Sequence, residues 1–245
     1  IEVTRGVTTD LPIPATAEIV LEGEIVPPGV DDRSEGPFGE WPGYYAGGVR
    51  QMPAFRVKSI LHRNNPIIQG NPPSLLPRVW TLGRHIQIAA TLWDELDRQL
   101  PGVKGVWLIE EGSVHGIVVI SLQQLYGGHA KQAALVAAGA LVTAYATKYI
   151  IVVDEDIDPS NTAEVLWALG TRSEPKEIEV IRDCWGSWAN PRLTPEQRQI
   201  NDREHSVGII LACKPYKWMK DFPAATKTSP ELAKKVRQKW PELFS

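Results

Sequence analysis

The stretch YIIVVDEDID, from Tyr149 to Asp158, decides the fold class. Its unbroken β-branched run predicts a strand that is covered on both faces, as the parallel strands of α/β proteins are. The acidic end of the stretch then lies at the carboxyl edge of a sheet. Asp154, Asp156 and Asp158 could hold a metal ion there, or their carboxylates could cap the following turn and helix. We favour the capping interpretation.

Helices and strands alternate around this stretch. Residues 79–100 have helical periodicity, VKGVWLIEEG and HGIVVISL predict two strands, and an Ala-rich helix is expected from His129 to Thr147. TAEVLWALGT predicts a further helix with Ser160 or Asn161 as its cap. HSVGIILACKP predicts the last strand, and SPELAKKVRQKWPELF an amphipathic helix capped by Ser229. The alternation predicts an α/β domain with helices flanking an open sheet.

The first 70 residues have a different pattern, which is β-rich. AEIVLEGEIVP alternates apolar and charged residues and predicts a strand with an irregularity at Gly23. AFRVKSILHRNNPIIQG, residues 54–70, predicts two more strands on either side of a turn at 64–66. Residues 170–203 are expected to be mostly loop. The fold class is therefore α+β, with a β-rich segment followed by an α/β domain.

Composition excludes several classes of protein. The 245 residues carry 26 Lys and Arg against 29 Asp and Glu, and a net charge of -3 gives no nucleic-acid signature. The two cysteines, Cys184 and Cys213, form neither a disulfide framework nor a metal-ligand spacing, which favours a reduced, cytoplasmic setting. The most apolar stretch, residues 134–146, is shorter than the ~20 residues of a membrane span. It predicts a helix buried against the sheet.

The stretch EGPFGEWPGYY places two carboxylates, Glu35 and Glu40, around Gly-Pro-Phe-Gly. The glycines and the proline interrupt the pleat, so both carboxylates can lie on one side. Trp41, Tyr44 and Tyr45 follow and could exclude water from that spot. A carboxylate in apolar surroundings has a raised pKa and can donate a proton near neutral pH. The alternative is a solvated acidic loop.

Five blocks in this order resemble the carboxyl-terminal half of a UbiD-type decarboxylase: PATAEIVLEGEI, EGPFGEWPGYY, YGGHAKQA, VVDEDIDPSNTAEVLWALGTR and ACKPYKWMKDFP. Members of that family reversibly decarboxylate aromatic, heteroaromatic or α,β-unsaturated acids with prenylated FMN. The resemblance implies that residues 1–75 are the carboxyl-terminal portion of a split-barrel-like cofactor-binding domain. Residues 76–205 would form an α/β oligomerisation domain, and residues 206–245 a final strand and a docking helix.

The resemblance also implies an Arg-Glu-Glu catalytic set. Glu40 would be the proton donor and acceptor, and Glu35 its partner in the network. The implied substrate pocket comprises Phe38, Trp41, Tyr44, Tyr45, Pro72, Trp80 and Trp185. The substrate would be a small carboxylic acid and CO2 the product, in a homo-oligomer with no nucleic-acid or membrane partner.

Part of the implied machinery has no counterpart in this chain. The family's arginine, its Mn²⁺ and K⁺ ligands and most of its flavin-phosphate contacts lie upstream of the motif, and residues 1–34 do not supply them. We therefore expect no metal ligands here, and an amino-terminal partner polypeptide or a longer chain that carries the arginine. Val207 and Leu211 stand where relatives often have Lys and Asp, which weakens the case for cofactor binding. The alternatives are a non-catalytic assembly or interaction subunit, or a subunit that works as a carboxylase.

Overall fold

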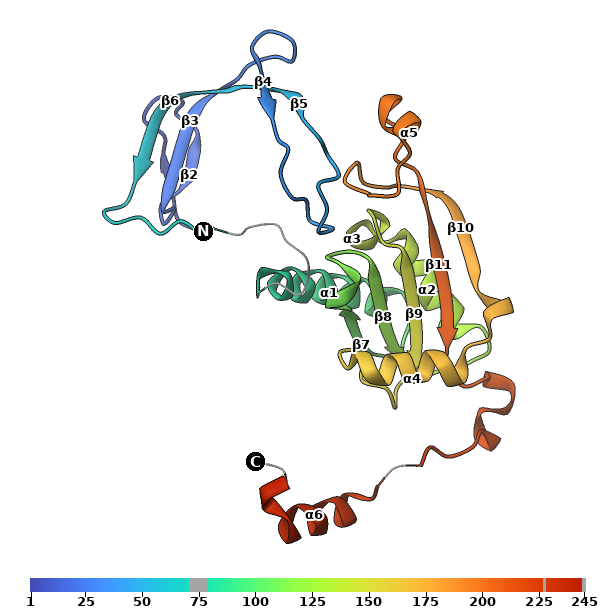
Figure 1. Cartoon of the computed structure of the whole chain (residues 1–245). Helices are drawn as coiled ribbons and strands as arrows, with labels where there is room; N and C mark the ends of the chain where they lie inside the picture. The colour runs from blue at the N-terminus through green and yellow to red at the C-terminus, as the bar shows by residue number, and fades with distance from the viewer. Residues whose placement is uncertain (71–78, 227, 244–245) are drawn as a thin grey trace. The chain divides into compact units, whose positions relative to one another are not determined.

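A five-stranded mixed sheet forms the centre of the α/β part of the chain (Figure 1). The structure is a computed structural model that describes residues 1–70, 79–226 and 228–243, except for the side chains of residues 79–81. The strand order is β10-β11-β9-β8-β7, with bounds β7 Val103–Leu108, β8 Ile117–Leu122, β9 Tyr149–Asp154, β10 Glu179–Cys184 and β11 His205–Ala212. Strand β9 pairs in parallel with both β8 and β11, whereas the two edge strands pair antiparallel.

The central strand β9 is covered on both faces, as its sequence predicts. Ile150 and Val152 belong to the larger core cluster, in which they meet residues of two helices. Ile151 and Val153 point to the opposite face and pack in a second cluster. Because side chains alternate along a strand, an unbroken apolar run suits a strand that is buried between two layers.

Helices on the two faces build these layers. Helices α1 (Val79–Gln99) and α2 (His129–Gly139) pack in the larger cluster, and α4 (Thr162–Arg172) packs in the second one (Figure 1). Asn161 caps α4, since its side chain accepts a hydrogen bond from the backbone N–H of Glu164. The other helices before Cys213 are α3 (Leu141–Ala144) and α5 (Pro195–Gln199), with the short helical turns η1 (Glu110–Gly112) and η2 (Pro175–Glu177).

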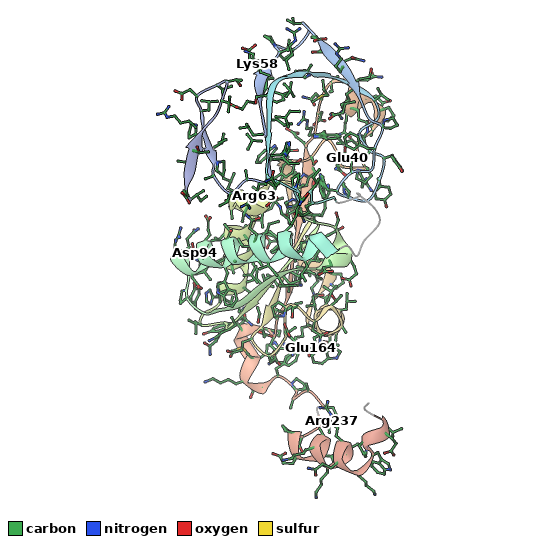
Figure 2. All side chains as sticks on the ribbon, turned by 90° about the vertical axis from the view of Figure 1, so that its left-hand side faces the viewer. Glu40, Lys58, Arg63, Asp94, Glu164 and Arg237 are labelled. Atoms are coloured by element: carbon green, nitrogen blue, oxygen red, sulfur yellow. The ribbon has the colours of Figure 1, made fainter. Side chains whose placement is uncertain are left out.

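The first 62 residues form three antiparallel pairs of strands. These pairs are β1 with β2, β3 with β6 and β4 with β5, with bounds β1 Val3–Arg5, β2 Pro12–Pro14, β3 Ile19–Ile25, β4 Asp32–Glu35, β5 Arg50–Pro53 and β6 Phe55–His62. The predicted irregularity at Gly23 is confirmed, because the β3–β6 register shifts between Glu22 and Gly23. An added Cβ on Gly23 would lie 2.0 Å from the Arg56 carbonyl oxygen, so the shift requires glycine. Lys58, labelled in Figure 2, forms a cross-strand ion pair with Glu24.

Three expectations about secondary structure were wrong. Residues 54–70 form one strand, β6, and not two. The Ala-rich helix is divided into α2 and α3, because Ala140 adopts an extended conformation (φ -65°, ψ 133°). Residues 170–203 contain the edge strand β10 and the helix α5. Strand β10 lies at an edge and carries three exposed charged residues, Glu179, Arg182 and Asp183, so its sequence lacks the apolar run of the inner strands.

Contacts between residues divide the chain into two compact units, Ile1–Cys213 and Lys214–Ser245. The second unit contains η3 (Tyr216–Asp221), α6 (Pro230–Lys239) and η4 (Pro241–Leu243). The Ser229 side chain caps α6, as predicted. The domain boundaries at 75 and 205 stay a prediction. Among the described residues, no helix is long and apolar enough to cross a membrane.

Candidate active site

The loop between β4 and β5 carries both predicted glutamates. Strand β4 ends at Glu35, which lies opposite Arg50 at the start of β5. Gly36 has a φ of +87°, which favours glycine, and the peptide bond before Pro37 is cis. A turn then closes on Glu40 (labelled in Figure 2): its backbone N–H donates to the Tyr44 carbonyl over 2.9 Å. The pleat is thus interrupted as the sequence predicts.

Glu40 is buried, with 8% of its surface exposed. An added Cβ on Gly47 would lie 3.3 Å from Glu40 Oε1 and 2.5 Å from the Trp188 ring, so all three groups are close together. Burial raises the pKa of the Glu40 carboxyl, the charge of Arg50 opposes that rise, and the charge of Glu35 adds to it. Among the described residues, no group donates a hydrogen bond to its carboxylate. Glu40 can therefore carry a proton at higher pH than an exposed glutamate.

Glu35 lies in different surroundings. Its side chain is exposed, whereas that of Glu40 is not. Arg50 connects the two sites: it faces Glu35 across the strand pair, and its guanidinium lies 4.0 Å from the centroid of the Trp188 ring. The Arg50 Nε also donates to the Gly47 carbonyl over 3.2 Å. One buried carboxyl, one exposed carboxylate and one cation thus lie around the same bend.

The loop is held against the α/β part of its own unit. Arg198 Nη1 donates to the carbonyls of Ala46 (2.6 Å) and Trp188 (3.1 Å), and its Nη2 donates to that of Asn190 (2.9 Å). Arg198 lies on α5, which begins with a capping box at Thr194. Because one guanidinium bridges both segments, it fixes the loop that carries Glu40 beside residues 187–192.

Beside this loop lies a cavity of about 220 Å³. Trp41 and Tyr44 supply aromatic walls, and Trp41 packs edge-to-face on His115 with ring centroids 5.3 Å apart. The cavity is lined by Trp41, Pro42, Tyr44, Gly112, Ser113, Gly116, Ala146, Lys148, Ser187, Asn190, Pro191, Arg192 and His205. These residues come from five separate stretches of the chain.

The predicted pocket residues divide into three groups. Trp41 and Tyr44 line the cavity. Phe38, Tyr45 and Trp185 do not line it and are exposed, although Trp185 packs on Tyr145 with centroids 5.0 Å apart.

Two predicted pocket positions remain. Pro72 and the side chain of Trp80 lie outside the described residues.

Sequence reasoning did not single out Lys148, Arg192 or His205. The segment WGSWANP, residues 185–191, was expected to line either the substrate mouth or an interface, and Ser187, Asn190 and Pro191 within it line the cavity. Lys148 follows an Ala-rich helix and precedes a buried strand, which gave no reason to place it in a site.

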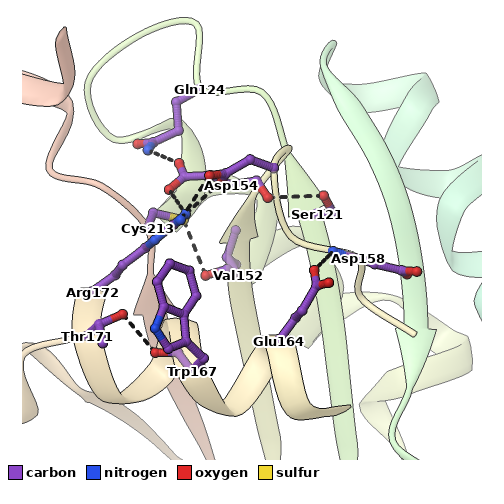
Figure 3. A network of polar contacts seen from close by, with 11 residues as sticks. Ser121, Gln124, Val152, Asp154, Asp158, Glu164, Trp167, Thr171, Arg172 and Cys213 are labelled. Carbon is purple, nitrogen blue, oxygen red and sulfur yellow. Dashed lines mark hydrogen bonds and ion pairs between the residues drawn. The ribbon is translucent and has the colours of Figure 1, made fainter. Parts of the chain in front are cut away.

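The acidic end of β9 forms an ion-pair network (Figure 3). Arg172, at the end of α4, donates to Asp154 (2.9 Å) and forms two hydrogen bonds with Asp156 (2.7 and 2.9 Å). Asp158 accepts hydrogen bonds from the backbone N–H and hydroxyl of Ser160, which is the predicted capping role. Within the described ranges, no group of three or more His, Cys, Asp or Glu side chains could hold a metal ion. Two of the three aspartates thus pair with an arginine.

The two positions that depart from the family pattern take part in packing. Val207 on β11 is 2% exposed and belongs to the larger core cluster, and Leu211 packs against that cluster. Neither residue lines the cavity beside Glu40.

The fold has two parts, strand pairs that carry a buried acid in the β4–β5 loop and an α/β sheet that follows them. Comparison with known protein families identifies both parts. The family model described as the 3-octaprenyl-4-hydroxybenzoate carboxy-lyase C-terminal domain matches residues 83–210. The model of the Rift-related domain of the same enzymes matches residues 1–74. The chain belongs to the UbiD family.

Particular relatives refine this assignment. The chain is 37% identical over 186 residues to a phenolic acid decarboxylase of Bacillus subtilis, covering 73% of this chain and 37% of the relative. The open form of Sedimentibacter hydroxybenzoicus vanillic acid decarboxylase is 30% identical, with a TM-score of 0.71 over 99% of this chain and 51% of that one. The UbiD-class enzyme HmfF from Pelotomaculum thermopropionicum, in complex with FMN, is 32% identical, with a TM-score of 0.76 over 95% and 49%. The chain thus spans about a third to a half of these relatives.

Proposed function

We propose that this chain is the carboxyl-terminal part of a carboxy-lyase that decarboxylates a small aromatic acid. The observation that carries the proposal is Glu40, a buried carboxyl with a raised pKa in the same loop that supplies Trp41 and Tyr44 to the wall of a cavity. The names of the relatives support an aromatic acid, since one acts on phenolic acids and another on vanillic acid. The proposal includes heteroaromatic and α,β-unsaturated acids, because their carboxylate is also bonded to an sp2 carbon.

The proposed role of Glu40 follows from its protonation state. The bond between the ring carbon and the carboxylate breaks, CO2 leaves, and the electron pair stays on the ring carbon. Glu40 then delivers its proton to that carbon, and positioned proton transfer of this kind contributes ~10²–10⁴-fold in rate. Glu35 is exposed, so it can exchange protons with solvent and restore the acid form. In the reverse direction, Glu40 would accept the proton, and the enzyme would act as a carboxylase.

The electron pair that CO2 leaves on the ring carbon must be stabilised until Glu40 protonates that carbon, and no side chain provides this stabilisation. We propose prenylated FMN, which supplies an electron sink when bound, because an evolved dimeric HmfF with 30% identity is in complex with prFMN. The cavity of about 220 Å³ is smaller than the ~300–1,000 Å³ of ordinary ligand pockets. It does not fit a flavin nucleotide, so we assign the main cofactor contacts, and any Mn²⁺ and K⁺ ligands, to protein outside the described residues.

The exposed apolar residues of the strand pairs support the proposal that a further polypeptide segment packs on them. Leu21, Ile25, Phe55, Val57 and Ile60 in the β3–β6 pair are exposed. A two-stranded pair is at best marginally stable alone, because it cannot bury its apolar faces. We propose that strands of an amino-terminal segment or partner polypeptide cover these faces and bring the catalytic arginine. A homo-oligomer in a cytoplasmic setting remains part of the proposal.

A non-catalytic assembly subunit is the second candidate. Val207 and Leu211 favour it, because their apolar side chains contribute to packing where relatives often have polar ones. The burial of Glu40 favours an enzyme over an assembly subunit. Burying a carboxyl group lowers the stability of the fold, and a role in catalysis explains why the chain keeps it.

The test uses the complete protein that contains this chain. Glu40→Gln should abolish both CO2 release and the exchange with deuterium of the proton at the reacting ring carbon of the decarboxylated product. Glu177→Gln is the matched control, because Glu177 is exposed on η2, far in sequence from the motif. Proton exchange at the wild-type rate in Glu40→Gln would exclude Glu40 from the mechanism. Absence of turnover in the wild-type assembly with every aromatic acid tried would favour the assembly subunit.

A further inference from the structure

The cavity beside Glu40 contains two cationic side chains and no acidic one. Lys148 and Arg192 both line it, whereas none of its thirteen lining residues is Asp or Glu. The backbone of Lys148 is fixed by the sheet: its N–H donates to the Gly116 carbonyl (3.0 Å), and its carbonyl accepts from the Gly208 N–H (2.8 Å). The position of one cation is thus set by the central strands.

These two cations have no counter-ion in the part of the chain that the structure describes: neither forms a salt bridge with a carboxylate there. Lys148 is half-buried, and both its burial and the nearby charge of Arg192 lower its pKa. Lys148 is partly desolvated and is repelled by the like charge of Arg192, which is itself exposed to solvent. An anion placed between them would relieve both costs.

Two of the neutral polar side chains in the cavity, Asn190 and Ser187, can also donate hydrogen bonds. Asn190 is 8% exposed, and its Oδ1 accepts from the backbone N–H of Arg192 (3.1 Å), so its amide N–H groups remain available. Ser187 Oγ accepts from the hydroxyl of Tyr145 (2.7 Å), which leaves its own O–H to donate. His205 differs: its Nε2 donates to the Thr147 carbonyl over 2.8 Å, so the buried Nδ1 of the neutral ring is an acceptor that has no partner among the described residues.

We propose that this cavity binds an aromatic anion, with its ionised oxygen against Lys148 and Arg192 and its ring against Trp41 and Tyr44. The ionised group is a carboxylate or a phenolate. The volume of about 220 Å³ suits one substituted ring. The identification of this anion with the substrate rests on the proposed function. Lys148 and Arg192 then determine specificity for acids over neutral aromatic compounds, and their recognition of an anion is independent of turnover.

Calorimetric titration of the complete protein tests the site with benzoate and its neutral analogue benzamide. Benzoate should bind at least tenfold more tightly. Lys148→Met and Arg192→Met should each weaken benzoate binding about tenfold, as expected for a charge-assisted hydrogen bond, and leave benzamide binding unchanged. Lys104→Met is the matched control, because Lys104 is an exposed lysine on β7 that does not line the cavity. Arg192 is exposed, so its variant carries little risk of misfolding.

Three results would overturn the proposal: no benzoate binding, equal affinity for benzoate and benzamide, or unchanged benzoate affinity in both cavity variants. The titration is repeated with Glu40→Gln, where retained benzoate affinity supports the anion site without reference to turnover. If benzoate binds as expected while no aromatic acid is turned over, the anion site stands and the proposed function fails.

Discussion

Replacing Arg172 by methionine should destabilise the first unit strongly. The guanidinium side chain is 2% exposed and pairs with Asp154, whose side chain is 6% exposed, and with Asp156, which is 33% exposed (Figure 3). The two carboxylates outweigh the cost of burial and raise the pKa of Arg172, so the guanidinium is charged. Methionine fills much of the same space but removes the positive charge that Arg172 places beside the buried carboxylate of Asp154.

The magnitude follows from these exposures. Removing one partner of a buried ion pair costs about 3–5 kcal/mol. Asp156 is about one-third exposed and water can solvate it, so its share is small. Asp154 keeps the hydrogen bond from Gln124 (2.7 Å), so the total loss of stability lies near the lower end of the range of about 3–5 kcal/mol. We expect a loss of about 3 kcal/mol in the free energy of unfolding, which corresponds to a Tm lower by about 6–12 °C for a unit of this size.

Urea unfolding, followed by tryptophan fluorescence and circular dichroism, measures this loss. Arg98→Met is the matched control, because Arg98 forms an exposed pair with Asp94 that is worth about 0.5 kcal/mol or less. The double variant Asp154→Asn/Arg172→Met should recover part of the loss, since it also removes the buried negative charge that Arg172 neutralises. A loss below about 1 kcal/mol in Arg172→Met would refute the view that this network holds the end of α4 to β9.

Three further changes have outcomes that the structure predicts. Arg50→Met should raise the pKa of Glu40, because it removes the opposing charge, so the alkaline limb of the kcat profile should move to higher pH. Gly47→Ala should lower turnover at least tenfold, because its Cβ would lie 2.5 Å from Trp188 and displace that ring from Glu40. In Glu22→Gln, the acid-dependent part of the Tm profile should flatten. Hydrogen bonds, first from the Thr9 hydroxyl, lower the pKa of Glu22 to about 2, so its stabilisation is present above pH 4.5 and is lost as the pH falls toward 2.

Each of these changes has a matched control. Arg33→Met removes an exposed arginine from the neighbouring strand β4 and should leave the pH profile in place. Gly83→Ala adds a methyl group where nothing lies within 4 Å and should leave turnover intact. Glu2→Gln should follow the wild-type Tm profile. An unmoved alkaline limb in Arg50→Met, full turnover in Gly47→Ala, or an unchanged acid profile in Glu22→Gln would each contradict the corresponding reasoning.

Local sequence determined the elements whose signals lie within a few residues. The β-branched run of β9 predicts burial on both faces, and alternate side chains do enter two different cores. The glycine and proline around Glu35 and Glu40 predict an interrupted pleat, and the loop is bent there. Capping residues such as Ser229 were predicted because their hydrogen bonds join residues three positions apart.

The sequence pattern failed where the partner of a residue is distant along the chain. The sequence of β10 has no clear strand pattern, and its residues form a strand through their pairing with β11. Arg172 lies sixteen and eighteen residues from the two aspartates that it pairs with. No local periodicity encodes such a pairing, because it depends on how α4 returns to the end of β9.

The candidate site also combines features that the local sequence determines with features that depend on distant parts of the chain. By itself, the sequence determined which carboxylates lie in the bend and which aromatic rings follow them. Only the tertiary structure decided that Glu40 is buried while Glu35 is exposed, because burial depends on Gly47 and on Trp188, which lies far along the chain. It alone brought Lys148 and Arg192 to the cavity of Trp41. Short-range patterns fix backbone conformation, whereas the electrostatics of a site come from contacts between segments that only folding brings together.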